Sequence, residues 1–466
     1  MHLYLQSVIK GSLRTSLPLY FSVRAMSAVP RISPKSAGRV NSLDQGGTVF
    51  AEFTALALAH KAVNLGQGFP TLPIPEFVTK AATDALTQNR LLHQYTRSEG
   101  HVRLAKALSA FYEDKLGRSL NPLTEIVTAV GACEAIYSTI QAFINPGDEV
   151  ILMQPFYDSY PASVTLAGGI PVMVSLRPPS DRSSKTSDDW KLDFDEIRRA
   201  IKPGKTKMII VNNPHNPVGK VFTREELEAI AQIATEYDLL VLADEVYETL
   251  VYTDSVAPLI KFASLPGMFE RTITVGSVGK MFGVTGWKIG WAVGAPDIIR
   301  SIWMVHQYVP FSVVTPLQEA TAVCLEQAAT NGYFERTRAE YQQLRDKLHT
   351  MLSSVGLTPT LPHGGYFILA DTSSLPDPAD ANGNAGAEEV DTDPRRDYRI
   401  CRFLTKEAGV TAIPPSAFYD PADKEGRDQI AGHLARFAFC KNEEMLEQAG
   451  DKLRAYFGDL KGNKAD

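Results

Sequence analysis

Between residues 125 and 294, short apolar segments alternate with longer amphipathic ones, and this alternation constrains the fold more than any other feature. The apolar segments are nearly continuous, as expected of strands buried on both faces of a sheet. Such strands with helical crossovers predict an α/β fold with a large, mostly parallel, seven-stranded sheet covered by helices. The predicted strands are EIVTAVG (125–131), EVILMQP (149–155), IPVMVSL (170–176), KMIIVNNP (207–214), LLVLADEVY (239–247), RTITVGSVGK (271–280) and KIGWAVG (288–294).

The pattern changes after about residue 327, where a long charged segment (333–356) predicts a helix followed by short strands. This change predicts a second, smaller α/β domain. Within it, 373–395 is rich in Asp, Ala, Pro and Gly and is interpreted as a mobile surface loop. The predicted division is a targeting segment (1–43), an N-terminal arm with part of the small domain (44–79), a large domain (80–327) and a C-terminal small domain (328–466).

The overall composition excludes several classes of function. A net charge of −6 argues against nucleic acid as the main partner, and no run of 18 apolar residues predicts a membrane span. The four cysteines are far apart and form no CxxC pair. They are interpreted as reduced thiols in an intracellular protein, and neither a disulfide framework nor a metal site is predicted.

Residues 1–43 carry six basic residues and no acidic one, with frequent serine and interleaved apolar residues. That composition is typical of a mitochondrial transit peptide, although a disordered N-terminus is the simpler alternative. A start at Met26 would lose much of this signal. We therefore expect a mitochondrial location, a cytoplasmic one, or both.

Polar groups gather at four predicted strand ends: NNPHNPVG (212–219), ADEVY (243–247), GSVGK (276–280) and AVGACEA (129–135). Ligands of such sheets lie beyond the carboxyl ends of the strands. Together these ends offer an amine, a carboxylate, an amide, a phenol and anion-binding amides. This set fits pyridoxal 5′-phosphate, whose aldehyde needs a lysine, whose ring nitrogen needs a carboxylate and whose phosphate needs hydrogen-bond donors.

Seven motifs, in order, resemble the fold-type I, pyridoxal-phosphate-dependent aminotransferases of class I/II. The match covers nearly the whole chain after about residue 48 and is most similar to the kynurenine aminotransferase branch, also described as glutamine transaminase K or cysteine-S-conjugate β-lyase. The motifs are LGQGFP (65–70), QYTRSEG (94–100), QPFYDSY (154–160), NNPHNPVGKVF (212–222), LADEVY (242–247), GSVGKMFGVTGWKIGW (276–291) and RFAFCK (436–441).

The resemblance assigns roles around the cofactor. Lys280 forms the Schiff base and carries a proton at the substrate's Cα. Asp244 pairs with the pyridinium nitrogen, while Tyr247 and Asn216 contact the ring's phenolic oxygen. The remaining contacts implied are Ser277, Lys288 and the amides of Ala132 and Cys133 at the phosphate, Tyr157 stacked on the ring, and Tyr95 reaching the phosphate from a second subunit.

The resemblance also assigns the substrate site. Arg436 clamps the α-carboxylate with help from Asn216, because only arginine offers two parallel hydrogen bonds. Gly68 lies where that carboxylate approaches the backbone. Phe50 lines the side-chain pocket, and Phe311 lines it from the partner subunit. Phe50 stands where some relatives have tryptophan, and Lys288 where many have arginine.

The implied protein is a homodimeric aminotransferase that moves the amino group of kynurenine, or of another aromatic, sulfur-containing or glutamine-like amino acid, to a 2-oxo acid such as 2-oxoglutarate. Kynurenine would give kynurenate. The alternatives are a cysteine-S-conjugate β-lyase and an aromatic, methionine or aspartate aminotransferase. A transcription regulator with an aminotransferase-like domain would need a preceding helix-turn-helix, which the acid-free N-terminus does not resemble. The Gln154–Pro155 and Asn216–Pro217 bonds are expected to be cis.

Overall fold

The computed structural model describes residues 32–44, 47–181, 183–378 and 393–458. Its strands within these ranges form a large eight-stranded sheet, a three-stranded sheet and a two-stranded one. The strands are β1 (Val63–Asn64), β2 (Ile126–Ala129), β3 (Glu149–Gln154), β4 (Ile170–Arg177), β5 (Lys191–Leu192), β6 (Thr206–Asn212), β7 (Leu240–Asp244), β8 (Thr272–Ser277), β9 (Gly290–Val293), β10 (Thr358–Pro359), β11 (Phe367–Asp371), β12 (Val410–Thr411) and β13 (Leu434–Ala438).

The large sheet has the order β2-β9-β8-β7-β6-β3-β4-β5. Strands β8, β7, β6, β3 and β4 pair in parallel, whereas β9 and β5 run against their neighbours. All seven predicted strands are therefore confirmed in a mostly parallel sheet. The eighth, β5, was not predicted because it is only two residues long, which is too short to show a periodic pattern.

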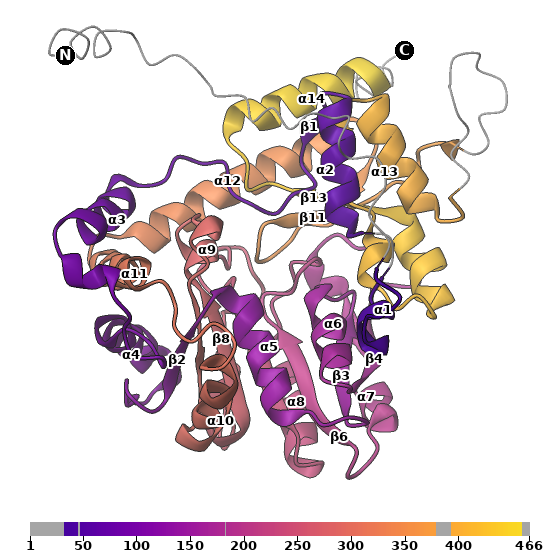
Figure 1. Ribbon diagram of the computed structural model, residues 1–466. Coiled ribbons are helices and arrows are strands. Elements are labelled where there is room, and N and C mark those ends of the chain that lie inside the picture. The colour runs from indigo at the N-terminus through magenta and orange to yellow at the C-terminus, as the bar shows by residue number, and fades with distance from the viewer. Residues whose placement is uncertain (1–31, 45–46, 182, 379–392, 459–466) are drawn as a thin grey trace, which may run out of the picture.

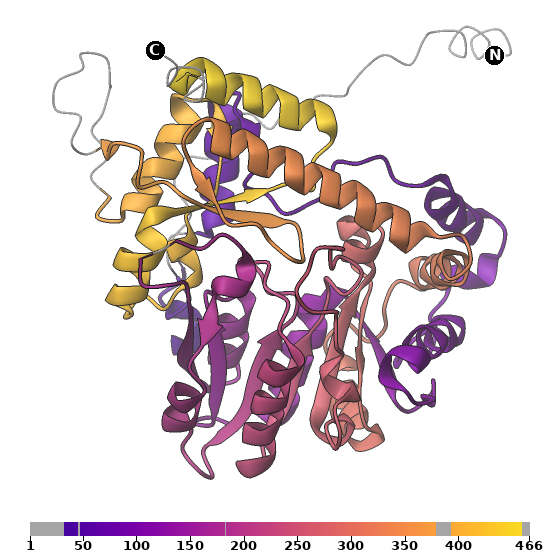
Figure 2. The ribbon, with the colours of Figure 1, turned by 180° about the vertical axis from the view of Figure 1, so that it is seen from behind.

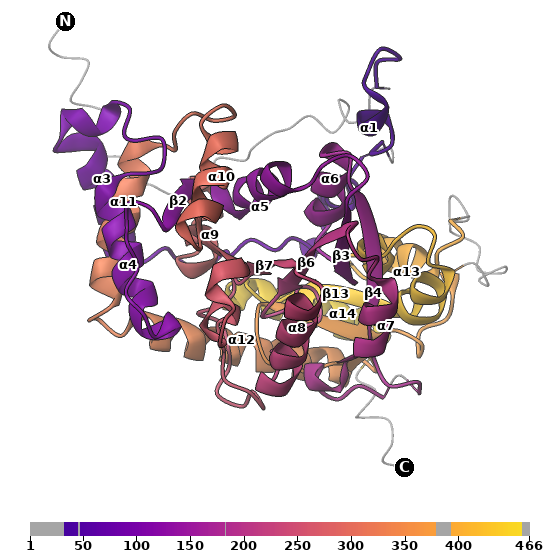
Figure 3. The same cartoon turned by 90° about the horizontal axis from the view of Figure 1, so that it is seen from below.

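The central strands are apolar throughout because both faces of the sheet are covered. Along β3, Val150 and Leu152 join one hydrophobic core, while Ile151 and Met153 join a second core on the other face. Figure 1 shows α5, α6 and α10 on one face of the sheet, and Figure 2, which views the molecule from behind, shows α8 on the other face. Figure 3, which views the sheet from below, shows the same helices on its opposite sides.

Helix α8 begins where the sequence signals it. The Thr223 hydroxyl accepts a hydrogen bond from the Glu226 amide, and the Glu226 carboxylate accepts one from the Thr223 amide, which together form a capping box. The helices are α1 (Gly38–Asn41), α2 (Val49–Ala59), α3 (Glu76–Thr87), α4 (Val102–Leu116), α5 (Gly131–Phe143), α6 (Ser159–Leu166), α7 (Phe194–Ala200), α8 (Arg224–Glu236), α9 (Val278–Met281), α10 (Pro296–His306), α11 (Thr315–Ala328), α12 (Tyr333–Ser354), α13 (Arg396–Lys406) and α14 (Glu443–Phe457). None of these helices is long and apolar enough to cross a bilayer.

The N-terminal and C-terminal parts of the chain form a layer beyond one end of the large sheet (Figure 1). There β1 pairs with β12, and α2 lies against α13. The antiparallel sheet β10-β11-β13 packs against α12, while α14 packs against α12, β1 and β12. The long charged segment is indeed one helix, α12. The exact domain boundaries stay a prediction, as does the targeting role of 1–43, most of which lies outside the described residues.

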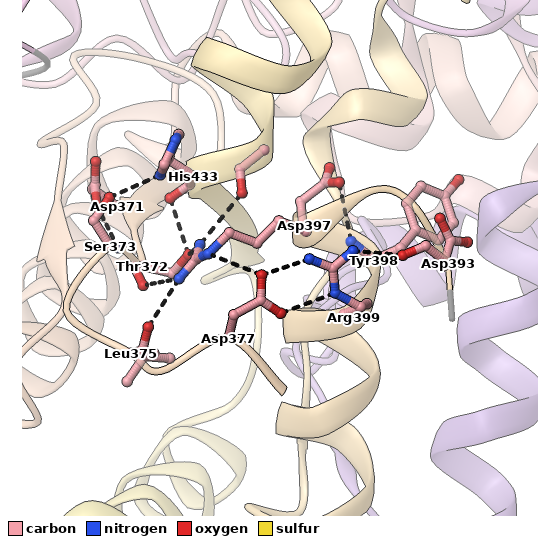
Figure 4. A network of polar contacts seen from close by, with 12 residues as sticks. Asp371, Thr372, Ser373, Leu375, Asp377, Asp393, Asp397, Tyr398, Arg399 and His433 are labelled. Atoms are coloured by element: carbon pink, nitrogen blue, oxygen red, sulfur yellow. Dashed lines mark hydrogen bonds and ion pairs between the residues drawn. The ribbon is translucent and has the colours of Figure 1, made fainter. Parts of the chain in front are cut away.

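Most of the predicted loop 373–395 also lies outside the described residues, but both of its described flanks are anchored to α13 (Figure 4). The guanidinium of Arg399 donates to the Asp377 carboxylate at 2.9 Å and to the Asp393 carbonyl at 2.5 Å. Arg396 donates to the carbonyls of Thr372 and Leu375, at 2.9 Å each. The two flanks therefore meet on one helix.

Candidate active site

A cavity of about 390 Å³ lies beyond the carboxyl ends of β6, β7 and β8. This is the edge of the sheet at which the sequence predicts the chemistry. Strand β9 runs the other way, so its first residues lie at the same edge. Twelve of the predicted site residues line the cavity: Phe50, Gly68, Ala132, Cys133, Tyr157, Asn216, Asp244, Tyr247, Ser277, Lys280, Lys288 and Arg436.

Asp244, the last residue of β7, is buried at the base of the cavity and is held there by neighbours. Its carboxylate accepts a hydrogen bond from the Tyr160 hydroxyl at 2.5 Å, and its carbonyl accepts one from the Asn212 side chain at 2.9 Å. Burial raises the pKa of Asp244, and the hydrogen bond from Tyr160 opposes that rise. A cationic group in the cavity would stabilise the charged carboxylate.

Lys280 follows β8 in the short helix α9 and is partly buried. Its Nζ donates a hydrogen bond to the Tyr366 hydroxyl at 2.7 Å and lies 5.7 Å from the centre of the Tyr247 ring. Burial lowers the pKa of Lys280, which increases the fraction of neutral amine at a given pH. A neutral amine is the form that can react as a nucleophile or accept a proton.

The turn from β2 into α5 forms an anion cradle. Gly131 has φ +73°, and a Cβ at Gly290 would lie 2.5 Å from the Gly131 carbonyl carbon and 2.6 Å from the Ala132 nitrogen. Both positions therefore need glycine, so that β9 can approach the start of the 13-residue helix α5. The first amides of α5, which have no partner within the helix, suit a phosphate group together with Ser277 and Lys288, which line the same cavity.

Arg436, in β13, is buried at the opposite side of the cavity. Its guanidinium donates to the Gly66 carbonyl at 3.0 Å and lies 3.5 Å from the Asn216 side-chain oxygen, while its Nε has no hydrogen-bond partner among the residues that the structure describes. Burial lowers its pKa to about 10. No carboxylate of the described chain forms an ion pair with Arg436, so it has binding capacity left for an acidic group.

Aromatic rings surround this arginine. The Arg436 guanidinium carbon lies 4.1 Å from the centre of the Phe367 ring, 4.7 Å from that of Phe418 and 5.4 Å from that of Phe50. A Cβ at Gly68 would lie 2.6 Å from Phe367, so only glycine allows this close packing. The arginine thus points into an apolar, aromatic part of the cavity.

Two predicted site residues lie outside the cavity of the single chain. Tyr95 is 83% exposed and Phe311 is 52% exposed, and their rings meet edge to face at 5.2 Å. Both were predicted to act in the site of a partner subunit. Their exposure is compatible with that role, which stays a prediction.

Sequence reasoning missed four residues that shape the cavity: Tyr160, Asn212, Tyr366 and Phe367. Tyr160 and Asn212 lie within motifs quoted above, and their polar side chains beside a predicted buried strand end were the available signal. Tyr366 and Phe367 lie far along the chain at the start of β11, where no motif indicated a site. Tyr157 lines the cavity as predicted, with its hydroxyl 3.3 Å from the Cys133 sulfur.

The peptide bonds Gln154–Pro155 and Asn216–Pro217 are both cis, as predicted. The Asn213–Pro214 bond is cis as well, which was not predicted. Two of the three therefore occur in the turn that follows β6 and carries Asn216.

Residues 60–449 match the family described as aminotransferase class I and II. The chain is 45% identical over 419 residues to kynurenine–oxoglutarate transaminase of Dictyostelium discoideum, covering 88% of this chain and 94% of that protein. It is 42% identical over 436 residues to kynurenine–oxoglutarate transaminase 3 of Mus musculus, covering 92% of each. The solved structure of Bna3p from Saccharomyces cerevisiae superposes with a TM-score of 0.84 at 34% identity, covering 92% of this chain and 100% of that one.

The chain belongs to the class I and II aminotransferases and is a transaminase. Membership of this family implies pyridoxal 5′-phosphate as the cofactor. The residues present fit that group: an amine at Lys280, a buried carboxylate at Asp244 that forms no ion pair within the described chain, and the anion cradle before α5. When bound, the cofactor supplies an electron sink for the negative charge that develops at the substrate's Cα.

Proposed function

We propose that this transaminase transfers the amino group of kynurenine, or of another aromatic, sulfur-containing or glutamine-like amino acid, to a 2-oxo acid such as 2-oxoglutarate. The observation that carries the proposal is that the buried Arg436 lies next to an aromatic wall, formed by the rings of Phe50, Phe367 and Phe418. The names of the relatives in Dictyostelium and mouse support kynurenine as a donor and oxoglutarate as an acceptor.

The proposed roles follow from the positions of the side chains. Arg436 binds the substrate's α-carboxylate, and Gly68 lets the backbone approach it. Lys280, whose pKa is lowered by burial, accepts the proton that leaves the substrate's Cα and returns it later in the cycle. Asp244 holds a positive charge at the base of the site, and Tyr247 and Asn216 lie beside it.

The choice of amino donor follows from the number of cationic side chains that line the cavity. Within the described chain, the cationic side chains that line the cavity are Lys280, Lys288 and Arg436. The two lysines serve the cofactor, which leaves Arg436 for a single substrate carboxylate. The second carboxylate of aspartate would be desolvated without a partner, at a cost of several kcal/mol. In this proposal 2-oxoglutarate avoids the same cost because its longer side chain carries the second carboxylate out of the cavity.

Steady-state kinetics with purified enzyme test this proposal directly. We expect kcat/KM for kynurenine or glutamine to exceed that for aspartate by about a hundredfold or more, since each 1.4 kcal/mol is a factor of about ten. If aspartate is the best donor, the pocket assignment is wrong. Release of pyruvate and ammonia from cysteine S-conjugates, without need of an oxo acid, would instead support the β-lyase alternative.

We also propose a homodimer in which each subunit supplies Tyr95 and Phe311 to the other's site. Both residues expose large apolar area outside the cavity, together with Tyr308 (80% exposed) and Val309 (57% exposed). Mixing Lys280→Ala with Tyr95→Ala chains should recover about a quarter of the wild-type activity, because random pairing produces mixed dimers with one intact site. Failure of mixed dimers to regain activity would contradict a shared site.

The N-terminal segment 1–43 is proposed to direct import into mitochondria, on the basis of its basic, acid-free composition. A reporter fused to this segment should accumulate in mitochondria, whereas a fusion that starts at Met26 should remain largely cytosolic. The same distribution for both fusions would contradict a transit peptide.

A further inference from the structure

The backbone segment Gly66–Phe69, which borders the substrate side of the cavity, is held in an unusual way. All four of its carbonyls accept hydrogen bonds from side chains of the C-terminal part of the chain. Arg436 donates to the first at 3.0 Å, Lys441 to the second and fourth at 2.9 Å each, and Tyr366 to the third at 2.6 Å. The position of this segment therefore depends on these three side chains, together with Asn64, whose side-chain oxygen accepts hydrogen bonds from the Gly66 and Gln67 amides.

Tyr366 connects this segment to the reacting lysine. A phenol has a single hydrogen, and that of Tyr366 is donated to the Gly68 carbonyl. Its oxygen therefore acts as an acceptor toward Lys280, whose Nζ lies 2.7 Å away. One hydroxyl thus joins the Lys280 amine and the Gly68 backbone in a single chain of hydrogen bonds.

The Tyr366 hydroxyl has little freedom to move. Its ring is fully buried and meets the rings of Tyr247 and Phe367 edge to face, at 5.0 Å and 4.8 Å between centres. Burial also raises the pKa of Tyr366 well above its usual value, so the phenol keeps its hydrogen at neutral pH. The hydroxyl is therefore a fixed point between the amine and the segment.

We infer that Tyr366 is a positioning residue of the transamination, which fixes the free amine of Lys280 relative to the substrate-facing segment Gly66–Phe69. When the lysine is released during turnover, Tyr366 holds its amine within reach of the substrate's Cα. Lys441 fixes the same segment, but no hydrogen bond of the described chain joins it to Lys280. The inference rests on the proposed role of Lys280 as the reacting amine.

The Tyr366→Phe variant tests the hydroxyl while keeping the ring. We expect kcat to fall about tenfold, the typical effect of losing one well-placed hydrogen bond. The matched control is Tyr341→Phe, because Tyr341 is buried with its ring 6.4 Å from that of Tyr366, and no described hydrogen bond joins it to Lys280 or to the segment. This control should retain wild-type kcat.

The second measurement does not depend on turnover. In full-length protein freed of cofactor, the pH dependence of Lys280 labelling by an amine-reactive reagent gives the pKa of the amine. Charged donors form stronger hydrogen bonds than neutral ones, so the Tyr366 oxygen favours the ammonium form. Its removal should move the labelling midpoint to lower pH by about 0.5 to 1 unit. The other groups that act on Lys280 stay in place in this variant: Asp244, Cys133, Cys440, Arg436 and Tyr247.

The Lys441→Met variant separates the two ends of the hydrogen-bond chain. It should raise KM for the amino donor several-fold, because the segment Gly66–Phe69 is loosened, while the Lys280 labelling midpoint stays at the wild-type pH. An unchanged midpoint and kcat in Tyr366→Phe, or equal shifts in Tyr341→Phe or Lys441→Met, would overturn the inference. Near wild-type turnover in Lys280→Ala would instead overturn the lysine assignment on which it rests.

Discussion

The two halves of the cavity are built in different ways. The half at the sheet edge comes from turns that directly follow β2, β6, β7 and β8, and hydrogen bonds already position two of its charged groups, Asp244 through Tyr160 and Lys280 through Tyr366. The substrate half is assembled from α2, the segment 66–69, β11 and β13, and the Nε of its arginine has no partner in the described part of the chain. The first half suits a resident group of fixed charge, and the second keeps hydrogen-bonding capacity for a ligand that enters and leaves.

A buried ionic cluster anchors the turn after β7, which contributes to the sheet half of the cavity. In the turn after β7, Asp244 and Tyr247 line the cavity, while Glu245 and Glu248 lie 2.9 Å and 2.6 Å from the Lys261 ammonium nitrogen. All three charged groups of this cluster are buried. A turn anchored on both sides is expected to keep its geometry with or without a ligand. The segment 66–69 of the substrate half is held instead by separate hydrogen bonds, to its carbonyls from Arg436, Lys441 and Tyr366 and from its amides to Asn64.

The largest expected effect lies in the sheet half. Lys280→Ala should reduce transamination by at least about a thousandfold, because both the nucleophile and the proton carrier are lost. Amino transfer from kynurenine to 2-oxoglutarate, followed by product formation, measures it. The urea unfolding midpoint should change little, since the partly buried amine forms no ion pair within the described chain. Turnover near the wild-type rate would remove Lys280 from the mechanism.

In the substrate half, Arg436→Lys should lower kcat/KM by about a hundredfold, mostly through KM, because lysine offers a point charge in place of two parallel hydrogen bonds. Arg345→Lys is the matched control, because Arg345 is equally buried but pairs with Asp254, away from the cavity. The control should lower the urea midpoint and leave KM unchanged. Equal effects of the two variants on KM would show that Arg436 is structural.

The sheet half could be predicted from the sequence and the substrate half only partly. Asp244, Ser277 and Lys280 end or directly follow continuous apolar strands, so local pattern and the parallel topology together place them at one edge. Arg436 was found only through resemblance to a family. Tyr366 and Phe367 were missed because their positions depend on how β11 packs over the sheet, which no local periodicity encodes.

The same reasoning explains the misses within the sheet half. Tyr160 lies in α6, and its contact with Asp244 depends on the packing of that helix against the sheet. The short strand β5 has no periodicity to detect. Contacts between distant segments and elements of two residues are therefore beyond what pattern alone predicts.

The sheet half should also be the source of an acid-sensitive stability. His215, in the turn that carries Asn216, is buried, and burial lowers its pKa from 6.5 to about 3. The unfolded chain binds a proton below pH 6.5 and the folded chain does not until about pH 3, so stability falls as pH drops through this window.

From pH 7 to 4.5 this histidine should cost about 2–3 kcal/mol of the free energy of unfolding. In His215→Gln, the loss of stability between these two pH values should be smaller by that amount. Urea unfolding at both pH values measures the difference. An identical pH dependence in the variant would show that His215 is not the group responsible.

The smallest expected effect concerns the aromatic wall of the substrate half. Phe50 lies beside Arg436 and contacts Phe418, with 6.1 Å between the ring centres. Phe50→Ala removes ring contact area that an aromatic side chain would use, but it leaves the carboxylate clamp in place. We expect kcat/KM to fall about tenfold for kynurenine and phenylalanine and only about twofold for glutamine, whose side chain is smaller and polar. The measurement is the ratio of kcat/KM for an aromatic donor to kcat/KM for glutamine in one enzyme preparation, because this ratio does not depend on the fraction of active enzyme. Equal losses for aromatic donors and glutamine would mean that Phe50 shapes the carboxylate-binding site at Arg436 itself. The site that binds the carboxylate of every amino acid could then not be separated from the aromatic rings that select among donor side chains.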